Sequence, residues 1–106
     1  SGGQKQRISI ARAFIRNPQI LIFDDCLSAV DTETEDQILS HLKEMIQSCT
    51  SIIISHRISS IKHADQIIVL NEGSIIEVGT HQQLLQKQGI YFEIHEQQLA
   101  EEDSLA

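Results

Sequence analysis

The chain has 106 residues, enough for one small domain, and its 41% hydrophobic and 22% charged residues exclude disorder throughout. No run of about 18 apolar residues occurs, so we expect no membrane span within the chain. A formal net charge of −7 argues against general nucleic-acid binding, and two cysteines without CxxC spacing argue against a disulfide scaffold or a Cys-rich zinc site, so we expect a reduced, cytosolic protein.

The chain opens with Ser1-Gly2-Gly3-Gln4 and continues into a predicted helix over Gln4–Arg16. Asn17-Pro18 ends this helix, because proline disfavours the helical conformation of the residue before it. Two glycines before a helix leave backbone amides open to an approaching anion. A flexible terminus is an equally good interpretation of these glycines on their own.

The next predicted element is a buried parallel strand over the apolar run Ile20–Phe23, which ends in Asp24-Asp25. The carboxyl ends of parallel strands are where α/β sheets bind ligands. At such a position Asp24 can hold Mg²⁺ through water, and Asp25 can orient or deprotonate an attacking water molecule. On the dipeptide alone, a loop or helix-cap role is the favoured alternative.

A second helix is predicted after a polar loop. Thr32-Glu33-Thr34-Glu35 fits a capping box, and Ile38 and Leu42 belong to an apolar stripe that continues the helix to about Gln47.

A second buried strand is predicted over Ser51–Ser55, which contains three consecutive isoleucines. His56 follows this strand, so we expect its side chain at the same sheet edge as Asp24. Most histidines after strands are only exposed loop residues, and this is the alternative for His56. The other histidines show no metal-ligand spacing, and we expect them on the surface: His41, His63, His81 and His95.

The remainder of the chain alternates short strands and helices. Gly73 is expected to have a positive φ in the turn of a hairpin, Thr80 to cap the following helix, and Gly89 to end it. The predicted elements are a helix over about Ser59–His63, strands over Gln66–Leu70 and Ile75–Val78, helices over Gln82–Lys87 and Ile90–Leu99, and an acidic tail over 100–106. This alternation predicts an α/β fold with a mainly parallel sheet.

Taken together, these segments resemble the C-terminal half of the ATPase domain of exporter-type ABC transporters, over essentially the whole chain. The resemblance rests on four motifs in the family's order: the signature motif at 1–4, the Walker B strand at 20–25, the D-loop at 28–31 and the H-loop at His56. The Gly79-Thr80-His81 segment, followed by Leu84-Leu85, Gly89 and Tyr91, is similar to the end of exporter cassettes. The resemblance implies a partial P-loop NTPase fold with helices on both faces of the sheet.

The resemblance also implies a division of labour among these residues. ATP and Mg²⁺ would be the cofactors of the parent protein, which would work at the cytoplasmic face of a membrane with a transmembrane domain and a second ATPase subunit. The implied site residues are Asp25 and His56 for catalysis, Asp24 for Mg²⁺ through water, Ser1, Gly2, Gly3 and Gln4 for ATP bound to the partner subunit, and Ser28, Ala29 and Asp31 in the D-loop.

The first departure from the family pattern is that these 106 residues contain no GxxxxGK[ST] phosphate loop. We therefore expect this polypeptide alone neither to hydrolyse ATP nor to bind it tightly. In this family the strand before the phosphate loop lies between the strands that match Ser51–Ser55 and Gln66–Leu70. Without it both strands have unpaired backbone groups, so we expect a soluble fragment that self-associates or has a rearranged sheet.

The second departure is Asp25, where the family usually has Glu. Aspartate is one methylene shorter, and a misplacement of about 1 Å can cost about 10²-fold in rate. A weak site with an intact signature motif indicates the weak-site half of a heterodimeric exporter. Two alternatives remain, a soluble ABC ATPase of DNA repair or translation and a non-catalytic regulatory interaction module.

Overall fold

The computed structural model describes residues 2–28 and 30–105, and the chain forms two compact units that divide after Ser60. The first unit contains α1 (Gly2–Ile15), β1 (Ile20–Asp24), α2 (Thr32–Gln47) and β2 (Thr50–Ile54), and α3 (Ile58–Ile61) begins at its end. The second unit contains β3 (Ile67–Asn71), β4 (Ser74–Gly79), α4 (His81–Lys87) and α5 (Ile90–Leu105).

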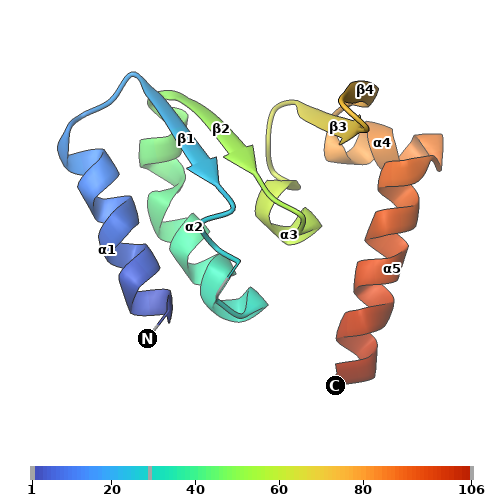
Figure 1. Cartoon of the computed structure of the whole chain (residues 1–106), viewed down its shortest axis with the longest axis horizontal. Coiled ribbons are helices and arrows are strands. Elements are labelled where there is room, and N and C mark those ends of the chain that lie inside the picture. The colour runs from blue at the N-terminus through green and yellow to red at the C-terminus, as the bar shows by residue number, and fades with distance from the viewer. Residues whose placement is uncertain (1, 29, 106) are drawn as a thin grey trace. The chain divides into compact units, whose positions relative to one another are not determined.

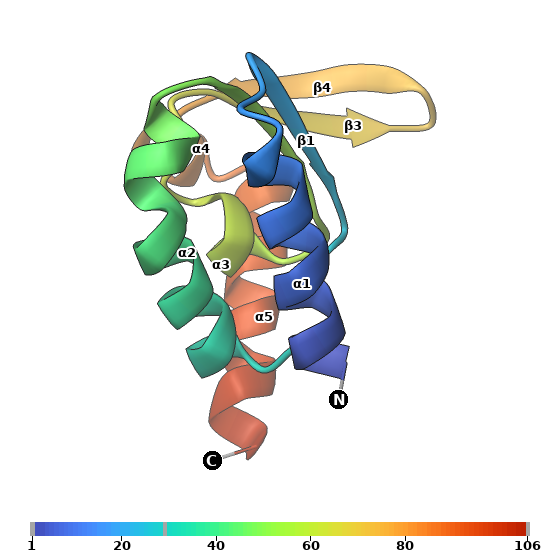
Figure 2. The ribbon, with the colours of Figure 1, turned by 90° about the vertical axis from the view of Figure 1, so that its left-hand side faces the viewer.

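In the first unit, β1 and β2 form a parallel pair, and α1 and α2 lie side by side against it (Figures 1 and 2). Leu21 and Phe23 of β1 point into the core, where Ile10 of α1 and Ile38 of α2 pack against them. Alternate residues of β1 face the other way, and Ile22 is 63% exposed there. Within this unit both long helices therefore cover the same face of the strand pair, which differs from the expected helices on both faces.

The ends of the first two helices follow from local chemistry. Asn17 adopts a left-handed backbone conformation (φ 52°) just before Pro18, and both features stop α1. At the end of α2, the Ser48 hydroxyl donates a hydrogen bond of 2.8 Å to the carbonyl of Met45, and the Ser48 amide donates to the same carbonyl at 3.3 Å, so a last-turn acceptor of the helix is satisfied locally.

The second unit is built on an antiparallel β3–β4 hairpin. Glu72 and Gly73 both have positive φ (49° and 78°), as the two central residues of a tight hairpin turn require, and the expectation for Gly73 is confirmed. The core of the second unit contains Ile67, Leu84 and Tyr91, each at most 3% exposed.

The helices of the second unit begin as the sequence indicates but end differently. Thr80 caps α4 and forms a reciprocal capping box with Gln83, as its position predicts. Gln88 (φ 55°), rather than Gly89, takes the left-handed conformation that ends α4. α5 continues to Leu105, so the described part of the acidic 100–106 segment is helical rather than a separate tail.

The α/β class is confirmed, with one difference in the sheet. β1 and β2 are parallel, but β3 and β4 form a separate antiparallel sheet, so the sheet is not mainly parallel. Among the helices that the structure describes, none has the length and apolar character needed to cross a bilayer.

Candidate functional site

The two carboxylates and the histidine singled out by the sequence follow neighbouring strand ends. In the parallel register Asp24 is paired with Ile54, and the amide of Asp25 donates a 2.8 Å hydrogen bond to the carbonyl of Ile54. Ser55 and His56 come directly after β2, so they leave the sheet at the same edge as the two aspartates. Asp24, Asp25 and His56 are all exposed, as groups that meet a ligand from solvent must be.

Asp25 has an unusual backbone conformation. Its φ of 56° lies in the left-handed region, which aspartate tolerates better than most non-glycine residues. Such conformations cost about 1–3 kcal/mol and are concentrated at functional sites. This conformation turns the chain sharply as it leaves β1, and the amide of Ser28 closes the turn on the carbonyl of Asp25 at 3.5 Å.

The loop between β1 and α2 is anchored by two apolar residues. Leu27 and Val30 are buried in the core of the first unit, whereas Ser28 and Asp31 are exposed. Ala29 lies outside the described residues. The polar members of the predicted D-loop, Ser28 and Asp31, therefore lie at the surface.

Asp31, rather than Thr32, is the N-cap of α2, and its side chain accepts no capping hydrogen bond from the helix backbone, so the capping box predicted over 32–35 is wrong. The carbonyl of Asp31 accepts the first intrahelical hydrogen bond, from the amide of Glu35 at 2.9 Å. The Thr34 hydroxyl beside Asp31 holds the pKa of that carboxyl below its usual range, so Asp31 is ionised at neutral pH.

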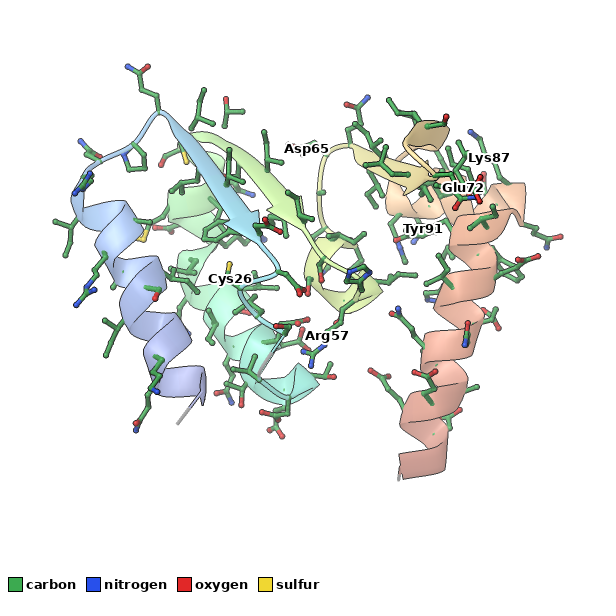
Figure 3. All side chains as sticks on the ribbon, in the orientation of Figure 1. Cys26, Arg57, Asp65, Glu72, Lys87 and Tyr91 are labelled. Atoms are coloured by element: carbon green, nitrogen blue, oxygen red, sulfur yellow. The ribbon has the colours of Figure 1, made fainter. Side chains whose placement is uncertain are left out.

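A buried ion pair that the sequence analysis missed joins the loop to the segment after His56. Glu35 is fully buried, and its carboxylate accepts a hydrogen bond of 3.0 Å from the Arg57 guanidinium. The same guanidinium, on the Arg57 side chain labelled in Figure 3, also donates to two backbone carbonyls. These are the carbonyls of Leu27 and Ser28, both at 3.3 Å. One signal in the sequence indicated the buried acid, because Glu35 precedes Ile38 by three residues and so lies on the apolar face of α2.

The N-terminal glycines belong to a helix rather than preceding one. α1 begins at Gly2, two residues before the predicted start, so Gly2 and Gly3 form its first turn. Backbone amides in the first turn have no partner within the helix. Gln4 is exposed, and Ser1 lies outside the described residues.

Cys26 directly follows the two aspartates, but its thiol is unreactive. Burial raises the pKa of its thiol, and the nearby Asp24 and Asp25 charges raise it further. The thiol therefore stays protonated at neutral pH and is a poor nucleophile.

The residues present fit a magnesium ion that is shared with phosphate oxygens. Within residues 2–28 and 30–105, no cluster of three or more His, Cys, Asp or Glu side chains is arranged to hold a metal alone. Magnesium does not need one, because it commonly binds one or two carboxylates together with substrate phosphates and water. The exposed carboxylate of Asp24 at the strand end meets that requirement.

Comparisons with known proteins agree on one family. The family model for ABC transporters matches residues 1–28. The chain is 57% identical to an uncharacterised ABC transporter ATP-binding protein, YknU, of Bacillus subtilis, a match that covers 92% of this chain and 17% of that protein. It is 52% identical to an ATP-dependent lipid A-core flippase of Acinetobacter baylyi, over 95% of this chain and 18% of the flippase.

A solved structure has the same fold. The structure of a bacterial Atm1-family ABC exporter with ATP bound matches 92% of this chain and 17% of the exporter, with a TM-score of 0.85 and 46% sequence identity. The chain thus spans less than a fifth of the length of these relatives.

Proposed function

This chain has the sequence and fold of the C-terminal part of the ATP-binding domain of exporter-type ABC transporters, and from this we propose that it belongs to a longer protein that couples ATP hydrolysis to transport across a membrane. The observation that carries the proposal is the shared sheet edge, where Asp24 and Asp25 end β1 beside the end of β2 that leads to His56. A fold-level likeness alone does not assign chemistry. The convergence of these polar groups supplies the chemical argument.

The carboxylates have separate roles in the proposed reaction. Asp24 would hold Mg²⁺ through water, and the ion when bound would supply positive charge beside the nucleotide's phosphate oxygens. Asp25 orients the attacking water molecule and accepts its proton. His56, from the neighbouring strand end, contacts the terminal phosphate of the same nucleotide.

The remaining predicted residues serve a second nucleotide. Ser1, Gly2, Gly3 and Gln4 approach ATP bound to a partner ATPase subunit, where the positive end of the α1 helix dipole suits the negative charge of phosphate. Ser28, Ala29 and Asp31 in the D-loop lie along the same subunit boundary. Both ATP sites are therefore completed by residues from two subunits, which makes a dimer part of the mechanism.

The partner subunit is a different chain in this proposal. Asp25 stands where the family usually has Glu, and its shorter side chain withdraws the carboxylate from the water molecule by about 1 Å, enough to slow hydrolysis by about 10²-fold. The chain therefore contributes the weak site of a heterodimer, and its glycine-bearing segment completes the strong site of the partner.

The 106 residues alone are inactive in this proposal. They contain no phosphate loop, so the chain's own ATP has no cradle of backbone amides. Apolar side chains on one face of the β1–β2 pair are exposed, among them Ile20, Ile22, Ile52 and Ile54. Exposed apolar faces and open strand edges favour self-association of the separate chain.

Coupling of ATP hydrolysis to transport also implies where the ATP-binding domain works. A transmembrane domain of the same longer protein forms the transport route, and the ATP-binding domain works at the cytoplasmic membrane face, where ATP is available.

The proposal is tested with the full-length protein, assembled with its partner in lipid vesicles. We expect Mg²⁺-dependent release of phosphate from ATP. To measure this chain's site alone, the catalytic base of the partner's site is first disabled. In that background Asp24→Asn, which removes a metal-binding carboxylate, should lower the rate at least about 10²-fold. Asp36→Asn, at an exposed acid on α2, is the matched control and should leave the rate unchanged. An assembled wild-type protein without ATPase activity would overturn the proposal.

A further inference from the structure

We propose that Arg57 and Glu35 are positioning residues, which tie the segment that carries His56 to the loop that follows Asp25. This inference deepens the proposed function and rests on it. The contacts of this pair fix the position of the loop relative to the segment that carries His56. The histidine and the D-loop therefore contact their nucleotides from fixed relative positions.

The Arg57 guanidinium donates hydrogen bonds to acceptors in two different segments. Arg57 Nη1 donates to the carbonyl of Leu27 at 3.3 Å and to the Glu35 carboxylate at 3.0 Å, and Nη2 donates to the carbonyl of Ser28 at 3.3 Å. These acceptors come from the loop and from α2, whereas Arg57 directly follows His56. A planar guanidinium can bridge several acceptors at once, which the compact ammonium of lysine cannot do in the same geometry.

Arg57 depends on the buried carboxylate of Glu35 for its position. The fully buried Glu35 carboxylate also accepts hydrogen bonds from the Ser59 hydroxyl at 2.6 Å and the Ser60 hydroxyl at 2.8 Å. Both serines lie in α3, two and three residues beyond Arg57. Glu35 therefore holds α2 and the start of α3 together, and its buried charge is compensated only while these partners stay in place.

The hydrogen-bonded residues lie close in sequence to Asp25 and His56. Leu27 and Ser28 follow Asp25 by two and three residues, and the amide of Arg57 donates to the Ser55 hydroxyl at 3.0 Å. His56 is thus enclosed between two residues whose positions are set by this network. A shift of the loop relative to His56 would break hydrogen bonds to a charged group, which are roughly twice as strong as neutral ones.

The experiment uses the full-length protein assembled with its partner. Arg57→Lys keeps the charge and removes the fork, and we expect kcat to fall about tenfold while KM for ATP stays within about twofold, because misplacement affects the reacting geometry more than binding. Arg16→Lys, at an exposed arginine beyond α1, is the matched chemical control. Ile38→Val, which removes one methylene from the same core without touching a hydrogen bond, controls for lost stability.

Two further measurements separate positioning from structural support. In a His56→Ala background, Arg57→Lys should lower kcat by a smaller factor than it does in the wild type, since part of the effect of the arginine passes through the histidine. Hydrogen exchange over 26–31 and 55–60 should be faster in Arg57→Lys than in Ile38→Val, and Glu35→Gln serves for this measurement if Arg57→Lys does not fold.

The inference is overturned if Arg57→Lys keeps the wild-type kcat, if its loss merely equals that of Ile38→Val, or if exchange over 26–31 is unchanged. A wild-type assembly without ATPase activity would instead refute the proposed function. In that case the exchange measurement on the same samples still decides whether the tie exists.

Discussion

The Glu77 carboxylate on β4 accepts a 2.8 Å hydrogen bond from the backbone amide of Tyr91, in the first turn of α5. A first-turn amide has no acceptor within its own helix, and a negative charge at that end is favoured by the helix dipole. The contact fastens the hairpin to α5 across 14 residues of chain. The side chain of Glu77 thus acts as a cap supplied by another element.

Glu77→Ala should therefore loosen the start of α5. We expect faster hydrogen exchange at the Tyr91 amide, by an amount equivalent to about 1 kcal/mol, which is typical of a lost N-terminal cap. Glu77→Gln is the matched control, because its amide oxygen still accepts the hydrogen bond. Equal exchange in the alanine variant and the wild type would show that the carboxylate does not hold the helix.

Asp25→Glu should raise the ATP turnover of the full-length protein assembled with its partner. The added methylene moves the carboxylate toward the attacking water molecule, and recovery of up to about 10²-fold at this site is expected. The left-handed conformation at this position is less favourable for Glu than for Asp, which limits the gain.

Asp25→Asn is the control for that substitution, since it keeps the shorter length and removes the negative charge. Its turnover should fall below the wild-type rate. An unchanged or reduced rate for Asp25→Glu would count against the weak-site proposal.

Local patterns predicted most of the fold. The apolar run at Ile20–Phe23 and the turn at Gly73 each carry a strong signal within a few residues, and both elements form where expected. The pairing of strands carries no such signal, because hydrogen bonds between distant segments depend on the rest of the sheet. The antiparallel β3–β4 sheet and the uncovered face of β1 are differences of this kind.

The candidate site was predicted unevenly for the same reason. Asp24 ends one strand and His56 comes shortly after the neighbouring one, so their shared edge could be expected from topology. The Arg57–Glu35 pair joins residues that are 22 apart in the sequence, so no short pattern indicates the contact. From their charge alone, both side chains would be expected at the surface. The roles proposed for the site residues remain predictions.

Ile38→Ala should destabilise the first unit. Ile38 is 8% exposed in the cluster with Leu21 and Phe23, and removing its outer carbons leaves a cavity that costs about 2–4 kcal/mol. Met45→Ala, on the same helix but 46% exposed, is the control and should cost far less. Urea unfolding of the chain, followed by circular dichroism, measures both.

The second unit should lose stability in mild acid through His81. Burial lowers the pKa of His81 below its ordinary value of 6.5, and the charges of His95, Lys62 and His63 lower it further. The unfolded chain then binds the proton more readily than the folded one, so stability is complete above about pH 6.5 and falls as the pH drops toward the folded pKa.

The imidazole shift of His81 in an NMR titration measures this pKa directly. His95→Gln removes the largest of the neighbouring charges and should raise the His81 pKa toward 6.5. A wild-type midpoint at or above 6.5 would contradict the expected direction.

Tyr91 is the only tyrosine in a sequence without tryptophan, and it lies 2% exposed in the second unit with its hydroxyl 2.7 Å from Nδ1 of His81. Near-ultraviolet absorbance and intrinsic fluorescence of the chain therefore report almost entirely on residues after Ser60. The half that carries Asp24, Asp25 and His56 contributes only phenylalanine, so a tryptophan introduced there would give each half its own optical signal.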